Sequence, residues 1–193
     1  MTSTAANLTP IRRHRYTVAD YYRMAEVGIL APDARVELID GEVIEMPPIG
    51  APHASTVTEV QRTLERAVGD AAIVRVQNPI HLGRHDEPQP DLALVTPPAS
   101  KYRLRHPRPG DVLMLFEVAD TTLRFDRDVK LGRYARVGIP EVWLLDVKAR
   151  TLQRFRESSP TGYGDSDQIG DLTALPIPGL DCVRVDLSNL WQR

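Results

Sequence analysis

The sequence is poor in the features that mark secreted, disulfide-bonded and membrane proteins. It has a single cysteine, Cys182, among 193 residues, which excludes an intramolecular disulfide and a cysteine-rich zinc site. No apolar run approaches the roughly 20 residues of a membrane-spanning helix. The polar first residues are not followed by the hydrophobic segment of a secretory signal. These absences favour a reducing compartment and no membrane partner, so we expect a cytoplasmic protein.

The chain also lacks a strong charge of either sign. Its formal net charge is −2 at pH 7, although 26% of its residues are charged. This balance argues against a protein whose whole surface binds nucleic acid, but it is compatible with a local basic groove. With 42% hydrophobic residues, the composition is typical of a soluble globular domain, and the length suffices for one sizeable core.

The sequence divides into a short tail and one domain. Residues 1–15 are polar and end in a basic cluster that includes Arg12 and Arg15. We predict a flexible basic tail there, either an ordinary solvated terminus or an arm that contacts phosphate. Residues 16–193 contain no internal repeat, low-complexity tract or linker, so we predict that they form a single domain.

Patterns of apolar residues predict helices and strands in mixed order. Spacings of three and four residues and capping signals predict helices over residues 17–27, 53–68 and 126–137. Asp40–Gly41 predicts the turn of a hairpin over residues 35–46, whereas residues 158–170 are typical of turns. Short apolar or alternating runs predict strands over residues 72–82, 91–95, 112–119, 141–146 and 151–157. This order favours an α/β fold with a mixed β-sheet flanked by helices.

Two acids lie in neighbouring apolar runs. Asp91 opens one predicted strand, and Glu117 follows 26 positions later inside the next. A carboxylate among apolar side chains is costly unless a metal or a charged partner meets it. If the strands are neighbours, the pair resembles the ligands of Mg²⁺, which binds few carboxylates, several waters and a substrate phosphate. The alternative is an Asx turn at Asp91 and a structural ion pair at Glu117.

The order of several segments is similar to a known family. The similarity extends from about Tyr16 to Trp191, and the segments that carry it read VELIDGEVIEMPPIGAPH, VQNPIHL, EPQPDLALV, FEVADTT and DRDVKLGRYARVGIPEVWLLD. Together they resemble the PD-(D/E)XK nuclease superfamily, and within it the Uma-two family of restriction-endonuclease-like proteins. The resemblance implies a restriction-endonuclease-like core and a nuclease site that uses Mg²⁺ or Mn²⁺.

The resemblance also implies roles for four residues. Asp91 and Glu117 match the two metal-binding acids, and Glu37 matches the additional acid that precedes them. The superfamily pattern places a lysine two positions after the second acid, where this chain has Ala119. Lys130, on the following predicted helix, looks like a migrated replacement. The implied catalytic set is therefore Glu37, Asp91, Glu117 and Lys130.

The catalytic role of Lys130 requires that its helix point it at the two acids. A lysine there would orient the attacking water and stabilise charge that develops on the phosphate. From spacing alone, the favoured interpretation of Lys130 is a solvated helix residue that pairs with Asp126, four positions earlier. We interpret Tyr134 and Trp143 as core residues rather than base-stacking platforms.

Five further residues are candidates for substrate binding. His53 begins a predicted helix and Gln77 precedes Asp91; each is also compatible with a structural hydrogen bond. A basic loop supplies phosphate-binding candidates, although such loops are often only solvated. Its three candidates are Lys101, Arg103 and Arg105.

We therefore expect a metal-dependent endonuclease that hydrolyses phosphodiester bonds of DNA. The alternative is a non-catalytic nucleic-acid-binding or regulatory module that keeps the nuclease fold, and a third hypothesis is an interaction protein whose acids only pair with Arg and Lys. A homodimer is expected for cleavage of both strands of a duplex, because symmetric dimers are the commonest oligomers.

Overall fold

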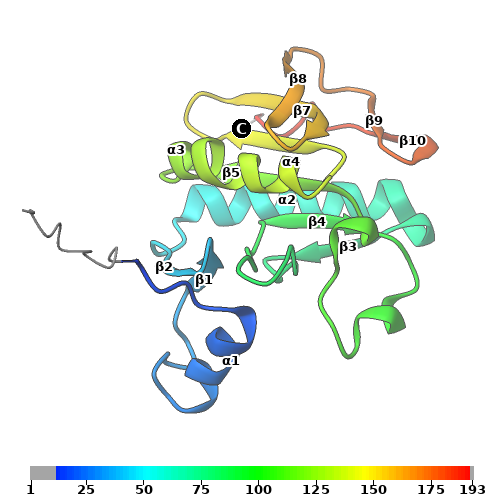
Figure 1. Ribbon diagram of the computed structural model, residues 1–193. Helices are drawn as coiled ribbons and strands as arrows, with labels where there is room; N and C mark the ends of the chain where they lie inside the picture. Colours follow the sequence, from blue (N-terminus) through cyan, green and yellow to red (C-terminus); the bar gives the residue numbers. More distant parts are fainter. Residues whose placement is uncertain (1–11, 192–193) are drawn as a thin grey trace, which may run out of the picture.

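The computed structural model describes residues 12–191 (Figure 1). Most of the predicted basic tail, residues 1–11, lies outside the described residues, so the tail and the domain boundary at residue 16 stay predictions. In the described part of the chain, no helix is both long and apolar enough to cross a membrane. The structure is built around one six-stranded sheet with strand order β3-β4-β5-β6-β7-β8.

The central sheet is mixed, as predicted. Its strands are β3 (Ile73–Val76), β4 (Leu92–Val95), β5 (Val112–Ala119), β6 (Val142–Asp146), β7 (Thr151–Ser159) and β8 (Gly162–Ile169). Only β5 and β6 pair in parallel, and each other neighbouring pair is antiparallel. A parallel pair needs a crossover connection, and the helical segment between β5 and β6 supplies it.

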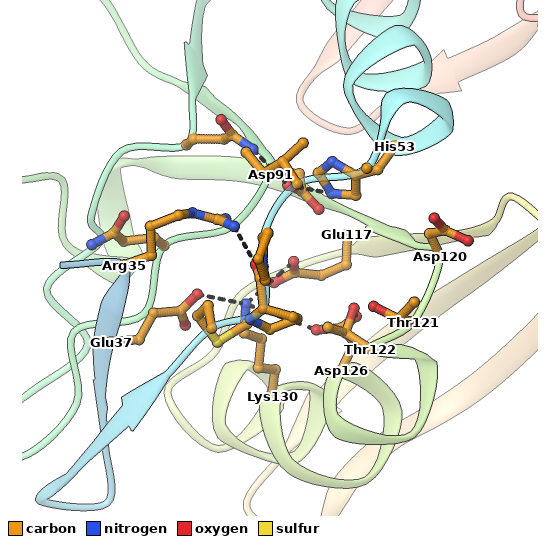
Figure 2. A pocket seen from close by; sticks show the side chains of 17 residues that line it. Arg35, Glu37, His53, Asp91, Glu117, Asp120, Thr121, Thr122, Asp126 and Lys130 are labelled. Carbon is orange, nitrogen blue, oxygen red and sulfur yellow. Dashed lines mark hydrogen bonds and ion pairs between the residues drawn. The ribbon is translucent and has the colours of Figure 1, made fainter. Parts of the chain in front are cut away.

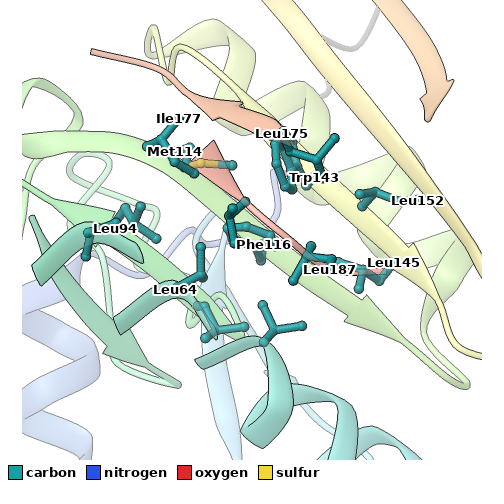
Figure 3. Close-up of a cluster of buried hydrophobic side chains, with 14 of the residues drawn as sticks. Leu64, Leu94, Met114, Phe116, Trp143, Leu145, Leu152, Leu175, Ile177 and Leu187 are labelled. Atoms are coloured by element: carbon teal, nitrogen blue, oxygen red, sulfur yellow. The ribbon is translucent and has the colours of Figure 1, made fainter. Parts of the chain in front are cut away.

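One face of the sheet packs against α2 (Ala51–Val68) and the small hairpin β9 (Leu175–Ile177) and β10 (Leu180–Val185). In β5, Met114, Phe116 and Val118 alternate toward this face because side chains on a strand have a period of two. The Phe116 and Trp143 rings meet edge to face, with centroids 5.0 Å apart. Figure 3 shows this apolar cluster, which fixes α2 against the sheet.

The other face packs against one helical segment that begins at Leu123 and ends at Arg136. It consists of α3 (Leu123–Phe125), the π-helical turn η4 (Asp126–Lys130) and α4 (Leu131–Arg136). Leu131 and Tyr134 are buried against the sheet in a second apolar cluster. The predicted helix is thus confirmed, but it begins three residues earlier and contains a π turn, a feature that is frequent at functional sites.

The first helix and hairpin are confirmed. Thr17 caps α1 (Val18–Glu26), and Asp20 completes the capping box. The hairpin of β1 (Val36–Ile39) and β2 (Glu42–Glu45) turns at Asp40 and Gly41, whose φ angles are 55° and 76°. A Cβ atom on Gly41 would lie 2.7 Å from Cβ of Arg15. Glycine is therefore required there by both the turn and the packing.

One strand prediction was wrong in extent, and one turn prediction was wrong. The strand predicted over residues 72–82 ends at Val76, because Gln77 has a φ of 48° and Pro79 cannot donate to the ladder. Residues 158–170, predicted as turns, contain β8, an edge strand on β7. The pattern-based prediction missed β8 because its polar sequence does not alternate between apolar and polar residues. Cross-strand ion pairs, such as Arg154 with Asp167 at 2.9 Å, accompany its backbone ladder.

The packing of α2 leads to a stability prediction. Leu64 is fully buried in the cluster of Figure 3, so Leu64→Ala should lower the free energy of unfolding by about 2–5 kcal/mol. Its neighbour Glu65 is exposed, and Glu65→Ala should change stability by no more than about 0.5 kcal/mol. Urea unfolding followed by circular dichroism measures both. Equal effects of the two substitutions would contradict the packing described.

Candidate active site

Asp91 and Glu117 meet because β4 and β5 are antiparallel neighbours. Leu92 pairs with Phe116, so Asp91 lies beside the end of β5, where its Oδ2 accepts a hydrogen bond of 2.8 Å from the backbone N–H of Val118. Glu117 is only 1% exposed. Its neighbours in β5, Phe116 and Val118, point to the sheet face that α2 covers. The side chain of Glu117 therefore points to the opposite face, which the α3–η4–α4 segment covers.

Lys130 points from that helical segment directly at the acids (Figure 2). Its Nζ lies 3.2 Å from Oε1 of Glu37, 3.5 Å from Oε2 of Glu117 and 3.8 Å from Oδ1 of Asp126. The side chain of Lys130 is only 3% exposed. The alternative of a solvated lysine paired only with Asp126 is therefore wrong. We call Glu37, Asp91, Glu117 and Asp126 the acid cluster.

Tyr134 also belongs to this network, a role that the sequence patterns did not predict. It lies one helical turn beyond Lys130, and its hydroxyl donates a hydrogen bond of 2.6 Å to Oε1 of Glu117. Asp126, Lys130 and Tyr134 follow at intervals of four residues, which places them on one side of the helix. Tyr134 is a core residue, as predicted, but it also orients Glu117.

Burial dominates the electrostatics of the acid cluster. It raises the pKa of Glu117 well above its ordinary value; the charge of Lys130 opposes this shift, while Asp126, Asp91 and Glu37 add to it. Burial likewise raises the pKa values of Glu37 and Asp126, again against the influence of Lys130.

Lys130 experiences the opposite balance. Burial alone would lower the pKa of its ammonium group, but Glu117, Glu37 and Asp126 together raise that pKa above its ordinary value. The ammonium group is therefore protonated throughout the physiological range. One cation faces more carboxylates than it can neutralise.

His53 and Gln77, two of the predicted substrate-binding residues, both contact Asp91. Nε2 of His53 lies 3.0 Å from Oδ1 of Asp91, and Nε2 of Gln77 donates to the same oxygen at 3.3 Å. The hydrogen bond to Asp91 raises the pKa of His53 above its ordinary value, despite partial burial. His53 comes from the first turn of α2, and the left-handed backbone of Gln77 ends β3 beside the site.

These residues line a pocket of about 290 Å³. The acid cluster, Lys130, His53, Gln77 and Gln89 all line it. Arg35, the loop between β2 and α2, and the turn after β5 complete the lining. Their residues are Met46, Pro47, Pro48, Ile49 and Gly50 from the loop, and Asp120, Thr121 and Thr122 from the turn.

The structure does not bring the basic loop to this pocket. The loop joins the end of β4 at Val95 to the start of β5 at Val112, whereas the acids lie at the opposite ends of these strands. Two of its predicted phosphate-binding residues are paired inside the loop: Lys101 and Arg105 lie 2.5 Å and 2.6 Å from carboxylate oxygens of Asp111. Arg103, the third, is exposed.

The residues of the acid cluster could hold a divalent metal ion. They offer hard carboxylate oxygens, and Oε2 of the buried Glu37 has no hydrogen-bond partner within residues 12–191. In the same range, no three His, Cys, Asp or Glu side chains form a ready-made metal cage. Mg²⁺ does not need one, because it keeps several waters and uses one or two carboxylates together with a substrate phosphate. The donor set thus fits a hydrated Mg²⁺ or Mn²⁺ ion at Asp91 and Glu117.

Known proteins share this fold. The model of the Uma2 family, described as "Putative restriction endonuclease", matches residues 18–182. A crystal structure of "a putative nuclease belonging to DUF820 from Anabaena variabilis ATCC 29413" is similar with a TM-score of 0.63 and 14% sequence identity, over 81% of this chain and 89% of that chain. At this identity the likeness shows the fold alone. Among curated proteins, none matches the chain.

The crowded acids predict a pH-dependent cost of removing Lys130. Lys130→Met should destabilise the metal-free protein by about 3–5 kcal/mol near pH 8, because it leaves buried carboxylates without a counter-charge. The cost should shrink near pH 5.5. Burial already raises the pKa values of Glu37, Glu117 and Asp126, so the folded state binds more protons than the unfolded state as the pH falls.

Urea unfolding in EDTA at the two pH values measures this effect. Lys148→Met is the control, because Lys148 pairs with Asp120 at 3.4 Å but its side chain is 67% exposed; its effect should stay below about 1 kcal/mol. A cost of Lys130→Met that stays constant or grows toward acidic pH would contradict the electrostatics described.

Proposed function

Because the chain belongs to the Uma2 family of restriction-endonuclease-like proteins, we propose that it is a divalent-metal-dependent endonuclease that hydrolyses phosphodiester bonds of DNA. The position of Lys130 carries this proposal. Its ammonium group lies 3.2 Å from Glu37 and 3.5 Å from Glu117, in a pocket that Asp91 also lines. Acids that can hold a divalent metal ion, with a fixed positive charge beside them, suit metal-assisted hydrolysis of a phosphodiester.

Asp91 and Glu117 would hold Mg²⁺ or Mn²⁺, with Glu37 assisting directly or through a water. When bound, such an ion acts as a Lewis acid and lowers the pKa of a coordinated water. Lys130 supplies a fixed positive charge that orients the attacking water and stabilises the charge that develops on the phosphate. Tyr134 holds one oxygen of Glu117 through its hydrogen bond of 2.6 Å, which leaves the other oxygen beside Lys130.

His53 and Gln77 are proposed as substrate contacts as well as supports for Asp91. Both line the pocket, and both carry N–H groups that suit a phosphate oxygen. Lys101, Arg103 and Arg105 would contact the nucleic acid farther from the pocket, where they would add affinity without sequence specificity. Arg103 is the most available of the three, because the other two pair with Asp111.

One observation favours the second candidate function, a non-catalytic nucleic-acid-binding module. Both oxygens of Glu117 already accept hydrogen bonds, one from Tyr134 and one from Lys130. A buried carboxylate that is satisfied in this way can be retained for the fold alone. Such a module would bind nucleic acid equally well with and without a metal ion.

A plasmid-nicking assay with Mg²⁺ or Mn²⁺ distinguishes the two functions. Wild type should nick supercoiled DNA, and excess EDTA should abolish the reaction. Asp91→Asn should lower the rate at least about 100-fold, because an amide is a poorer metal ligand than a carboxylate. Asp128→Asn is the matched control, because Asp128 is an exposed acid in η4, and its rate should equal that of wild type.

The endonuclease proposal fails if wild type cuts neither supercoiled plasmid nor a single-stranded oligonucleotide with either ion, or if Asp91→Asn keeps the wild-type rate. DNA binding that is unaffected by metal and by Asp91→Asn would then support the binding module.

A further inference from the structure

We infer that the pocket accepts an unpaired nucleotide of a single-stranded or locally opened DNA strand, and not a nucleotide within an intact duplex. This inference rests on the proposed function, because it assigns a substrate class to the same site. Three properties of the pocket lead to it: the burial of the reactive groups, the small volume, and the chemistry of the walls.

The reactive groups have little exposed surface. Glu117, Lys130 and Glu37 are 1%, 2% and 4% exposed, and the side chain of Asp91 is 14% exposed. The β1–β2 hairpin, the start of α2 and the turn after β5 enclose them from different sides (Figure 2). A scissile phosphate must therefore pass the rim before it reaches the acids. We therefore expect the paired base and the neighbouring phosphates of a duplex to meet the rim first.

The volume of the pocket fits one nucleotide. At about 290 Å³ it lies at the small end of ligand pockets, which range from about 300 to 1,000 Å³. Enzymes that take a base into a pocket act on single strands or turn the nucleotide out of the helix, which costs unpairing and unstacking energy. A strand that is already unpaired avoids this cost.

The walls differ in chemistry in a way that matches the parts of a nucleotide. Met46, Pro47, Pro48 and Ile49 form an apolar side, and Ile49 is 41% exposed at the rim. This side suits the face of a base, whereas the acid cluster with its metal ion suits the scissile phosphate.

Arg35 supplies a positive charge at the mouth of the pocket. It is exposed, lines the pocket and donates a hydrogen bond to the backbone oxygen of Pro47. Among the described residues it forms no ion pair with an acid, unlike Lys130 or Arg133. Its guanidinium group is therefore available to a phosphate that flanks the bound nucleotide.

Binding tests the inference independently of cleavage. Fluorescence anisotropy compares a labelled single-stranded oligonucleotide with the blunt duplex of the same sequence, with Ca²⁺ as a hard oxygen-binding ion in place of Mg²⁺. The single strand should bind at least about tenfold more tightly. Equal or tighter binding of the duplex overturns the inference.

The salt dependence of single-strand binding tests the role of Arg35. Loss of one phosphate contact should reduce the slope of log K against log salt by about 0.7 in Arg35→Ala. Arg66→Ala, an exposed arginine of α2 outside the pocket, should keep the wild-type slope. An unchanged slope in Arg35→Ala overturns the assignment of Arg35 to a flanking phosphate.

Cleavage separates failure of this inference from failure of the proposed function. Wild type with Mg²⁺ is given a single strand, the blunt duplex, and a duplex with a central unpaired region. Faster cleavage of the first and third substrates, with cuts confined to the unpaired region, supports the inference. Equal or faster cleavage of the duplex overturns the inference but keeps the nuclease function. If none of the three substrates is cut while the single strand still binds more tightly than the duplex, the nuclease function is wrong. The inference that the pocket accepts an unpaired nucleotide then stands.

Discussion

The burial of one ammonium group among three carboxylates is the interaction on which the rest of the structure depends. Lys130 is 2% exposed and lies within 3.8 Å of Glu37, Glu117 and Asp126. Desolvation of such charges costs several kcal/mol per ion, and only close, well-placed partners offset it. The partners come from β1, β5 and η4, and Glu37 is 93 positions from Lys130. The β1–β2 hairpin must therefore dock against the sheet and the helix for these charges to be compensated.

This constraint also gives the site its chemical character. Burial, and to a smaller extent the neighbouring acids, raise the pKa values of Glu37, Glu117 and Asp126 against the opposing charge of Lys130. A divalent cation would relieve the repulsion among these acids. The same burial removes bulk water, and fixed charges in such a site act strongly on charge that develops in a reaction. Because the reactive groups are buried, only a substrate that can enter the small pocket can reach them.

The local patterns predicted most of the elements, and the family resemblance supplied the four central residues. The period of two in β5 and the four-residue spacing of Asp126, Lys130 and Tyr134 were visible in the sequence. The hydrogen bond from Tyr134 to Glu117 was not, because it depends on how the helix is placed on the sheet. Edge strand β8 was missed because its polar residues show no apolar alternation. The three candidates in the basic loop do not line the pocket, because Asp91 precedes β4 and Glu117 lies late in β5, so the antiparallel pairing puts the loop at the far end.

The most direct test of the central claim is calorimetric titration of Mn²⁺ into wild type and Glu117→Gln. The amide keeps the shape of Glu117 and an acceptor for Tyr134, but it removes the charge that the metal site needs. The account predicts saturable binding to wild type and affinity weakened at least about tenfold in the variant. Wild type that binds no Mn²⁺, even with a DNA oligonucleotide present, would contradict it. The buried charges would then serve the fold alone.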